Sequence, residues 1–146
     1  MYLWHGTYED TKDDILKTGV LKNTMSTGTT NEIDDIFVKY LGFNPRENCI
    51  YFSGDTESAD GYDYAFRVHT RAINTDLLYV GDFSLTDEMF GTIEKNELKV
   101  ICEKYANTLT TFSDYFKNSH GFMNRNVWEL EFLYFGEIEV DEDDLD

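Results

Sequence analysis

The first seven residues hold the part of the sequence that is best suited to chemistry. The apolar and aromatic run Tyr2-Leu3-Trp4 is followed by His5, Gly6 and Thr7. A histidine can donate or accept a hydrogen bond near neutral pH, and a glycine lets a ligand approach the backbone closely. We therefore interpret the run as a short strand that ends in a binding site. The alternative is a half-buried edge strand whose histidine has a structural partner.

A second candidate lies in the middle of the chain. Residues 49–52 are predicted to form a short buried strand, and Ser53-Gly54-Asp55 ends it at once. Tyr51 stands one step from the end of this strand. An aromatic side chain at such a position can face a cleft.

A third candidate lies near the C-terminus. Residues 127–134 alternate, which predicts a strand with Glu129 and Glu131 on one face and apolar side chains on the other. Carboxylates are rarely buried without a partner. The pair therefore favours either a functional site or a solvent-facing strand edge.

These candidates must be positioned by one domain of ordinary size. A chain of 146 residues buries roughly 68–70% of its unfolded surface and needs no disulfide bond or structural metal to fold. Helices are predicted over 7–19, capped by Thr7 or Asp10, and over 31–41, and again over 85–116 with breaks near Gly91 and at 107–108. Further strands are predicted at 64–70, 77–80 and 137–140, with loops at 23–30 and 117–126. The acidic residues 141–146 are expected to be a disordered tail.

Composition limits the classes of partner. The formal net charge is -17, from 29 acidic and 12 basic residues. Such a charge argues against binding to a phosphate backbone, although an acidic surface can imitate nucleic acid. Cys49 and Cys102 are far apart, and neither has another cysteine nearby in the sequence. This fits a reducing, cytoplasmic setting. No apolar run reaches the ~18 residues of a membrane span, and no basic signal-peptide start is present.

His5, Tyr51 and Glu129 occur in the order and context of the His-Tyr-Glu triad of the ADP-ribosyltransferase superfamily. Leu3-Trp4-His5-Gly6-Thr7 resembles the Leu-Trp-His-Gly-Ser/Thr motif of poly(ADP-ribose) polymerases. Ile50-Tyr51-Phe52 is similar to their Gly-Ile-Tyr-Phe-Ala segment, and residues 57–62 to Ser-Lys-Ser-Ala-Asn-Tyr with one insertion. The resemblance implies an α+β fold with that superfamily's split β-sheet core and flanking helices over residues 1–140.

The resemblance also implies that the substrate is NAD and that each of its two riboses is contacted by one of these residues. Glu129 would stabilise the oxocarbenium-like ribose that forms when the bond to nicotinamide breaks. His5 would hold the ribose on the adenosine side.

The nicotinamide end would be held by the glycine and its neighbours. The backbone of Gly6, next to Thr7, would bind the carboxamide with help from the Ser58 hydroxyl. Tyr51 and Tyr62 would stack on the ring. Arg67, or else Lys22 or Arg71, would offset the charge of the diphosphate.

The sequence departs from the family in several places. Cys49 stands where the family has glycine, and the inserted Gly61 leaves either Tyr62 or Tyr64 as the second stacking ring. Residues 129–131 also match the Glu-x-Glu of arginine-directed toxin relatives, in which the second glutamate is catalytic. That branch opens with arginine rather than histidine, so we prefer Glu129 and keep Glu131 as the alternative.

The implied function is transfer of a single ADP-ribose from NAD to a macromolecular acceptor, for which a protein is preferred. Small enzymes of this kind are frequent among bacterial and phage effectors and counter-defence proteins, an analogy at the level of the fold. Two alternatives remain: a non-enzymatic acidic DNA mimic that binds a basic groove, and a degenerate member of the fold that binds NAD without turnover.

Overall fold

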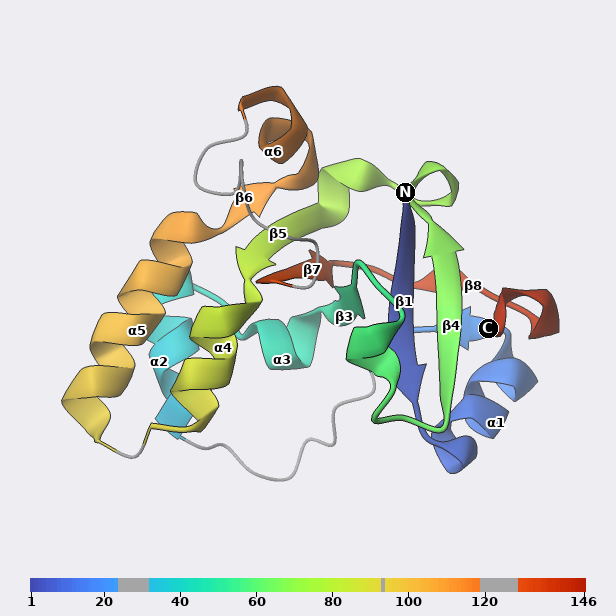
Figure 1. Cartoon of the computed structure of the whole chain (residues 1–146), viewed down its shortest axis with the longest axis horizontal. Helices are drawn as coiled ribbons and strands as arrows, with labels where there is room; N and C mark the ends of the chain where they lie inside the picture. Colours follow the sequence, from blue (N-terminus) through green and yellow to red (C-terminus); the bar gives the residue numbers. More distant parts are fainter. Residues whose placement is uncertain (24–31, 93, 119–128) are drawn as a thin grey trace.

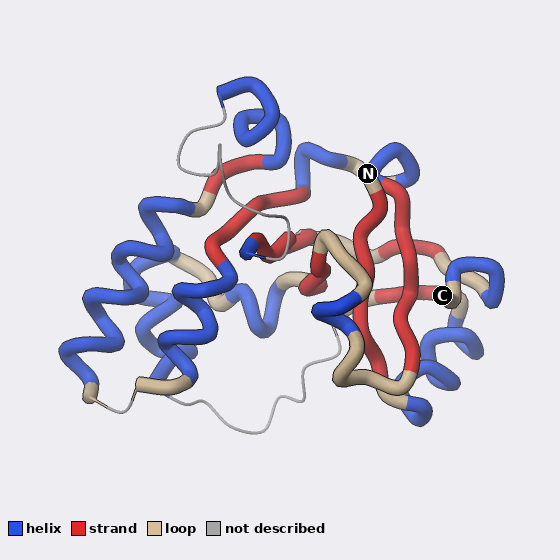
Figure 2. Tube along the Cα trace, in the orientation of Figure 1, coloured by secondary structure: helices blue, strands red, loops and turns tan. Residues whose placement is uncertain are grey.

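An antiparallel sheet of six strands forms the centre of the molecule, with strand order β4-β1-β3-β7-β5-β6 (Figures 1 and 2). The computed structural model describes residues 1–23, 32–92, 94–118 and 129–146. A separate two-stranded sheet pairs β2 with β8. The strands are β1 (Tyr2–Thr7), β2 (Val20–Leu21), β3 (Ile50–Ser53), β4 (Tyr64–His69), β5 (Leu78–Asp82), β6 (Thr110–Thr111), β7 (Leu130–Tyr134) and β8 (Ile138–Glu139).

The six-stranded sheet has two closely paired parts. β1 pairs with β4 along its whole length, from Tyr2 opposite His69 to Thr7 opposite Tyr64. β7 pairs along its length with both β3 and β5. Between β1 and β3 the register contains one residue pair, Trp4 opposite Ser53. The parts β4-β1 and β3-β7-β5-β6 are therefore joined by only one register pair.

Helices cover the sheet at two ends. The helix α1 lies beside β1 and β4, whereas α2, α4 and α5 gather at the opposite end (Figure 1). The α-helices are α1 (Glu9–Thr18), α2 (Glu32–Leu41), α3 (Pro45–Asn48), α4 (Phe83–Phe90), α5 (Lys95–Thr108) and α6 (Phe112–Asn118), and the short 3-10 turns are η1 (Glu57–Ala59), η2 (Thr70–Ala72), η3 (Thr75–Leu77) and η5 (Glu142–Asp144).

The core is divided in the same way as the helices. One cluster packs α1 and the two-stranded sheet against one face of the six-stranded sheet, with Leu3, Phe52, Phe66 and Phe132 at its centre. A second cluster joins α2, α4 and α5. Every residue of β7 is buried. Because side chains alternate along a strand, its odd-numbered residues face away from the first cluster, and their burial shows that β7 is covered on both faces.

The predicted mixed α+β fold, with a sheet and flanking helices, is confirmed. Gly19 ends α1 in the left-handed conformation, at φ 72°, as the sequence predicts for a helix-terminating glycine. The predicted N-caps of α1 are wrong, because Thr7 ends β1 and Tyr8 holds the cap position without a side-chain hydrogen bond. Asn44 caps α3, and the single proline, Pro45, is its first residue.

The late strand is shorter than predicted. Its first residue is Leu130, so Glu129 precedes β7 and does not share a strand face with Glu131. Residues 127 and 128 lie outside the described residues, as do 24–30 of the predicted early loop, residue 31 at the start of the predicted helix 31–41, and 119–126 of the predicted late loop. Helix α6 extends to Asn118. Strand β6 was not predicted, because its residues fall within the predicted helix 85–116. It lies between α5 and α6 in the chain and pairs with β5.

The expected disordered tail at 141–146 is ordered in the structure. Asp141 caps η5 in a capping box with Asp144. Leu145 forms a bridge with Phe66, and the backbone N–H of Asp146 donates to the carbonyl of Ala65 at 2.9 Å. The segment is therefore fixed by the outer edge of β4, which would otherwise have open backbone groups. Charge alone was a poor guide here because these contacts are long-range.

Candidate functional site

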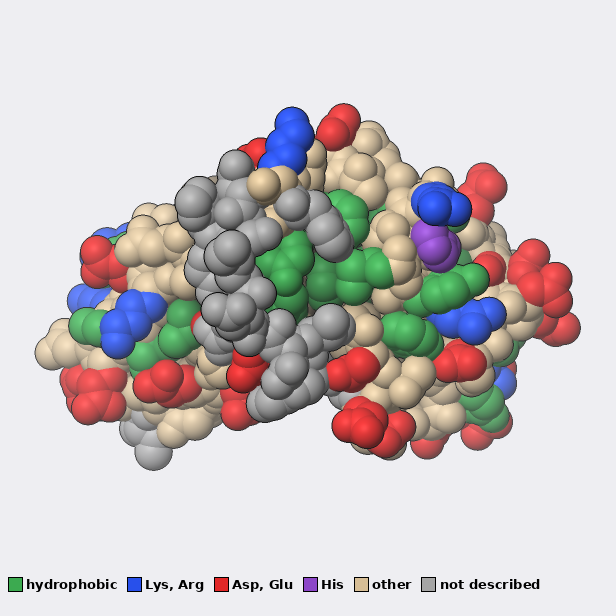
Figure 3. Space-filling view, turned by 45° about the horizontal axis from the view of Figure 1, so that its top comes forward, with side chains coloured by type: hydrophobic (Ala, Val, Ile, Leu, Met, Phe, Trp, Pro, Cys, Tyr) green, Lys and Arg blue, Asp and Glu red, His purple; other side chains and the backbone are tan. Residues whose placement is uncertain are grey.

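A cavity of about 350 Å³ opens between the two parts of the sheet and helix α4. Its volume lies within the range of small-molecule sites in proteins. On the face of the molecule shown in Figure 3, hydrophobic side chains gather in the middle and acidic side chains lie towards the outer edge of the molecule. The lining residues come from β1, α3, β3, η1, the segment between η1 and β4, α4 and β7. They are Trp4, His5, Gly6, Arg46, Tyr51, Phe52, Ser53, Ala59, Tyr62, Phe83, Thr86, Asp87, Phe90, Leu130 and Glu131.

His5 is fixed in one orientation at the cavity. Its Nδ1 lies 2.7 Å from the carbonyl oxygen of Tyr51. A carbonyl only accepts, so Nδ1 carries the hydrogen and Nε2 is left as an acceptor in the neutral ring. Burial is the main effect on its pKa and lowers it, while the bond to Tyr51 works in the opposite direction. Near neutral pH His5 therefore offers an uncharged acceptor.

The ring of Tyr62 lies directly against Gly6. A Cβ built on Gly6 would overlap this ring, so a residue with a side chain at position 6 would displace it. Tyr62 is 45% exposed, and it also contacts the ring of Tyr8 at 5.1 Å between centroids. The other candidate ring, Tyr64, carries the Lys12 ammonium 4.1 Å above its centroid and lines a different hollow. Of the two candidates, Tyr62 is the ring at Gly6.

Glu131 is the buried carboxylate of the cavity, with 5% of its surface exposed. On β7 it lies between Ser53 of β3 and Gly81 of β5. Burial raises its pKa to about 7, although hydrogen bonds from Tyr105 and Thr86 lower it. Near neutral pH the carboxyl group is therefore divided between its charged and neutral forms.

The structure separates the two glutamates that the sequence offered. Glu131 lines the cavity, and Glu129 does not belong to the described lining. Glu129 was the preferred catalytic candidate on the strength of its sequence context. Its position before β7 contradicts the separate prediction that both side chains share one face of a strand.

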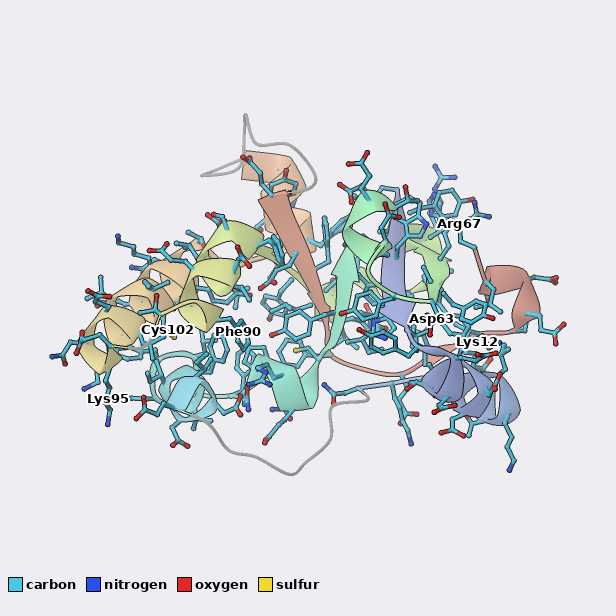
Figure 4. The ribbon with its side chains drawn as sticks, turned by 60° about the horizontal axis from the view of Figure 1, so that its bottom comes forward. Lys12, Asp63, Arg67, Phe90, Lys95 and Cys102 are labelled. Carbon is cyan, nitrogen blue, oxygen red and sulfur yellow. The ribbon has the colours of Figure 1, made fainter. Side chains whose placement is uncertain are left out.

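Several other predicted residues lie away from the cavity. Thr7 is buried, and its hydroxyl donates to the carbonyl of Tyr8 at 3.4 Å. Arg67 is exposed on β4 with its guanidinium 4.6 Å above the ring of Tyr2 (Figure 4). Lys22 and Arg71 are not in the described lining either. Ser58 belongs to η1, and its side chain is outside the described part of the chain.

Other lining residues were missed by the sequence analysis. Arg46 pairs with the buried Asp34 at 3.0 Å, and its guanidinium lies 5.1 Å from the ring centroid of Phe90 on α4. Thr86 is also on α4. Tyr105 on α5 does not line the cavity but donates to Glu131, and its place in the helical apolar stripe of residues 98–105 predicted only that it lies in the core. Asn44 followed by Pro45 was a signal for a capped helix start that holds Arg46, but the partner Asp34 could not be known from spacing.

Comparisons with protein-family models, with curated proteins and with solved structures found no match. Over the described residues, no group of histidine, cysteine and carboxylate side chains is arranged to hold a metal ion. None of the helices in these residues has the length and apolar character that a membrane span requires.

Proposed function

We propose that this protein binds NAD in the cavity and transfers ADP-ribose to a macromolecular acceptor, with Glu131 as the carboxylate beside the reacting ribose. One observation carries the proposal. His5, Gly6, Tyr51, Tyr62 and Glu131 come from distant parts of the chain, and all of them line the same cavity. Four of these five were selected by resemblance to the ADP-ribosyltransferases, and Glu131 takes the place of Glu129.

The Gly6 side of the cavity suits the flat nicotinamide ring. An aromatic ring already lies on Gly6, which shows that this surface accepts one, and only glycine leaves the room. The ring is the protein's own Tyr62, so nicotinamide would enter only after Tyr62 moves away. Because 45% of Tyr62 is exposed, its ring can leave Gly6 without displacing the buried core. A displaced Tyr62 could then stack on the cationic ring.

Glu131 suits the reaction itself. The bond between the ribose C1′ and the nicotinamide nitrogen breaks, and its electron pair goes to the ring nitrogen, which releases neutral nicotinamide. The charge left on the ribose is positive, so a carboxylate fixed nearby stabilises it. The acceptor atom then bonds to C1′ and releases its proton to Glu131 or to water. A pKa of about 7 lets Glu131 serve both as the anion and as the proton acceptor.

Two further residues suit the polar parts of NAD. The Nε2 atom of neutral His5 is an acceptor for a ribose hydroxyl. Arg46 is the basic residue in the described lining, and it replaces Arg67 as the candidate that offsets the diphosphate charge. Its ion pair with Asp34 fixes the guanidinium but also takes part of its charge.

The sheet supports the finer fold assignment. The superfamily is expected to have a split β-sheet, and the parts β4-β1 and β3-β7-β5-β6 meet here at one residue pair. The cavity opens beside this junction, with His5 and Gly6 on one part and Glu131 on the other. We propose the split ADP-ribosyltransferase core on this basis.

The test is calorimetric titration with NAD, followed by a search for transfer of labelled ADP-ribose to proteins of a cell extract. Saturable binding is expected for the unchanged protein, and Glu131→Gln should bind NAD but fail to transfer. Glu139→Gln on the exposed position of β8 is the matched control and should behave like the unchanged protein. Absence of NAD binding at millimolar concentration would contradict the proposal and favour the DNA mimic.

A further inference from the structure

Two hydroxyl groups reach Glu131 from the helical layer. Thr86 on α4 donates to Oε1 at 2.8 Å, and Tyr105 on α5 donates to the same atom. Within the described ranges, Oε2 receives no hydrogen bond. Both donors are themselves buried, with exposed fractions of 7% for Thr86 and 0% for Tyr105. The carboxylate is therefore held through one oxygen only.

The space for the Tyr105 hydroxyl is provided by a glycine. Gly81 on β5 stands directly opposite Glu131 in the sheet. A Cβ on Gly81 would lie 2.7 Å from the hydroxyl oxygen of Tyr105 and 3.0 Å from its ring. Since Tyr105 also packs against Phe37 at 6.0 Å between centroids, its ring has little freedom to give way. Any side chain at position 81 would push the hydroxyl from its place.

We infer that Tyr105 and Thr86 are positioning residues that hold Oε1 of Glu131, leaving Oε2 for the ligand in the cavity, and that Gly81 gives Tyr105 the room to do so. A carboxylate bound at both oxygens would have to break a bond before it met the ribose. A carboxylate bound at neither would keep rotational freedom, and positioning would be lost. The catalytic consequence rests on the proposed function, whereas the geometry does not.

The same contacts set the charge of Glu131. Burial raises the pKa of this carboxyl group most, the bonds from Tyr105 and Thr86 lower it, and the nearby charge of Asp82 raises it. Removal of either hydroxyl should therefore raise the pKa above its present value of about 7. The other titratable or charged groups that line the cavity or interact with Glu131 are His5, Arg46, Cys49, Tyr51, Tyr62 and Asp87.

The direct experiment is an NMR titration of the Glu131 carboxyl carbon, which needs neither NAD nor activity. Tyr105→Phe and Thr86→Val should each raise the pKa of Glu131 by about one pH unit, because a hydrogen bond to a charged group is lost. Gly81→Ala should cause a similar rise although it removes no hydroxyl. Tyr79→Phe is the matched control: Tyr79 also lies on β5 but does not line the cavity, and its loss of a hydroxyl should leave the titration unchanged.

An unchanged pKa of Glu131 in folded Tyr105→Phe and Thr86→Val would overturn the inference. Two variants are needed because Tyr105 is fully buried and its replacement could affect folding, whereas Thr86→Val conserves shape at the surface of the cavity.

The catalytic part is tested by the pH dependence of NAD turnover. In both variants the rising limb of the rate profile should move to higher pH by the same amount as the titration. The rate at high pH should largely recover, which a merely destabilised protein would not show. A pKa that moves while the rate profile of an active enzyme does not would overturn the positioning role. An inactive unchanged protein with the expected titrations would contradict the proposed function and support the inferred contacts.

Discussion

The two walls of the cavity are built in different ways. The wall of β1 is made by consecutive residues, His5 and Gly6, in a strand that β4 pairs along its whole length. The wall of Glu131 is made by a residue of β7 together with Thr86 of α4 and Tyr105 of α5. The first wall depends on local sequence and backbone geometry. The second depends on packing between elements that are distant in the chain, so a change in any of them reaches the carboxylate.

Replacement of each of the two glutamates by glutamine tests this difference most strongly. Glu131→Gln keeps the shape of the side chain but removes the charge, and loss of one fixed electrostatic contact of this kind typically costs on the order of 10²–10³ in rate. Glu129→Gln should cost far less, because Glu129 does not belong to the described lining of the cavity. Transfer rates measured at saturating NAD check this expectation. A dead Glu129→Gln beside an active Glu131→Gln would return the catalytic role to the residue that the sequence favoured.

The glycine wall is tested by filling it. Gly6→Trp should abolish binding of NAD, because the indole would take the space in which a flat ring lies. Calorimetry with nicotinamide as the ligand isolates the effect on this end of the cavity. Gly61→Ala is the control, since a Cβ at Gly61 would meet nothing within 4 Å. Equal affinity for nicotinamide in Gly6→Trp would remove this wall from the ligand site.

The cost of burying Glu131 should appear as a pH dependence of stability. Its pKa is raised from 4.5 to about 7 in the folded protein. The folded state therefore holds the proton more tightly, and this stabilisation is complete below the unfolded pKa of 4.5 and is lost as the pH rises through about 7. Glu131→Gln lacks this dependence. Between these pH values, the free energy of unfolding should fall by about 3 kcal/mol more in the unchanged protein than in Glu131→Gln.

Urea unfolding at a series of pH values measures this difference, and titrations shared by both proteins cancel in the comparison. Glu139→Gln should follow the unchanged protein, because Glu139 is exposed. Parallel curves for the unchanged protein and Glu131→Gln would show that Glu131 titrates in the folded protein as it does in the unfolded chain.

The same contrast explains what could be predicted from the sequence. The β1 wall and Tyr51 on β3 were found in advance, because His5, Gly6 and Tyr51 stand in short, recognisable segments with a clear strand pattern. Glu129 was preferred over Glu131 because the chain opens with histidine rather than arginine. Alternation placed both glutamates on one strand face, and it could not say that the strand begins only at Leu130. The bonds from Thr86 and Tyr105 could not be predicted, since they depend on how α4 and α5 pack against β7. The apolar stripe of α5 correctly placed Tyr105 in the core and gave no sign of its hydroxyl.

The smallest expected effect concerns the C-terminal segment, which covers the outer side of the β1 wall. Trp4 donates through Nε1 to Asp146 at 3.0 Å, Asp146 donates its N–H to Ala65, and Leu145 packs against the first core cluster. Deletion of residues 145–146 should lower the free energy of unfolding by about 1–2 kcal/mol, because it removes hydrogen bonds and part of an apolar side chain. Affinity for NAD should hardly change, since neither residue lines the cavity. Glu142→Gln is the control for charge alone. If the truncated protein unfolds at the same urea concentration, these contacts do not stabilise the fold. If NAD affinity falls with the stability, the outer face of β1 and the cavity wall are coupled, and the local character of this wall is disproved.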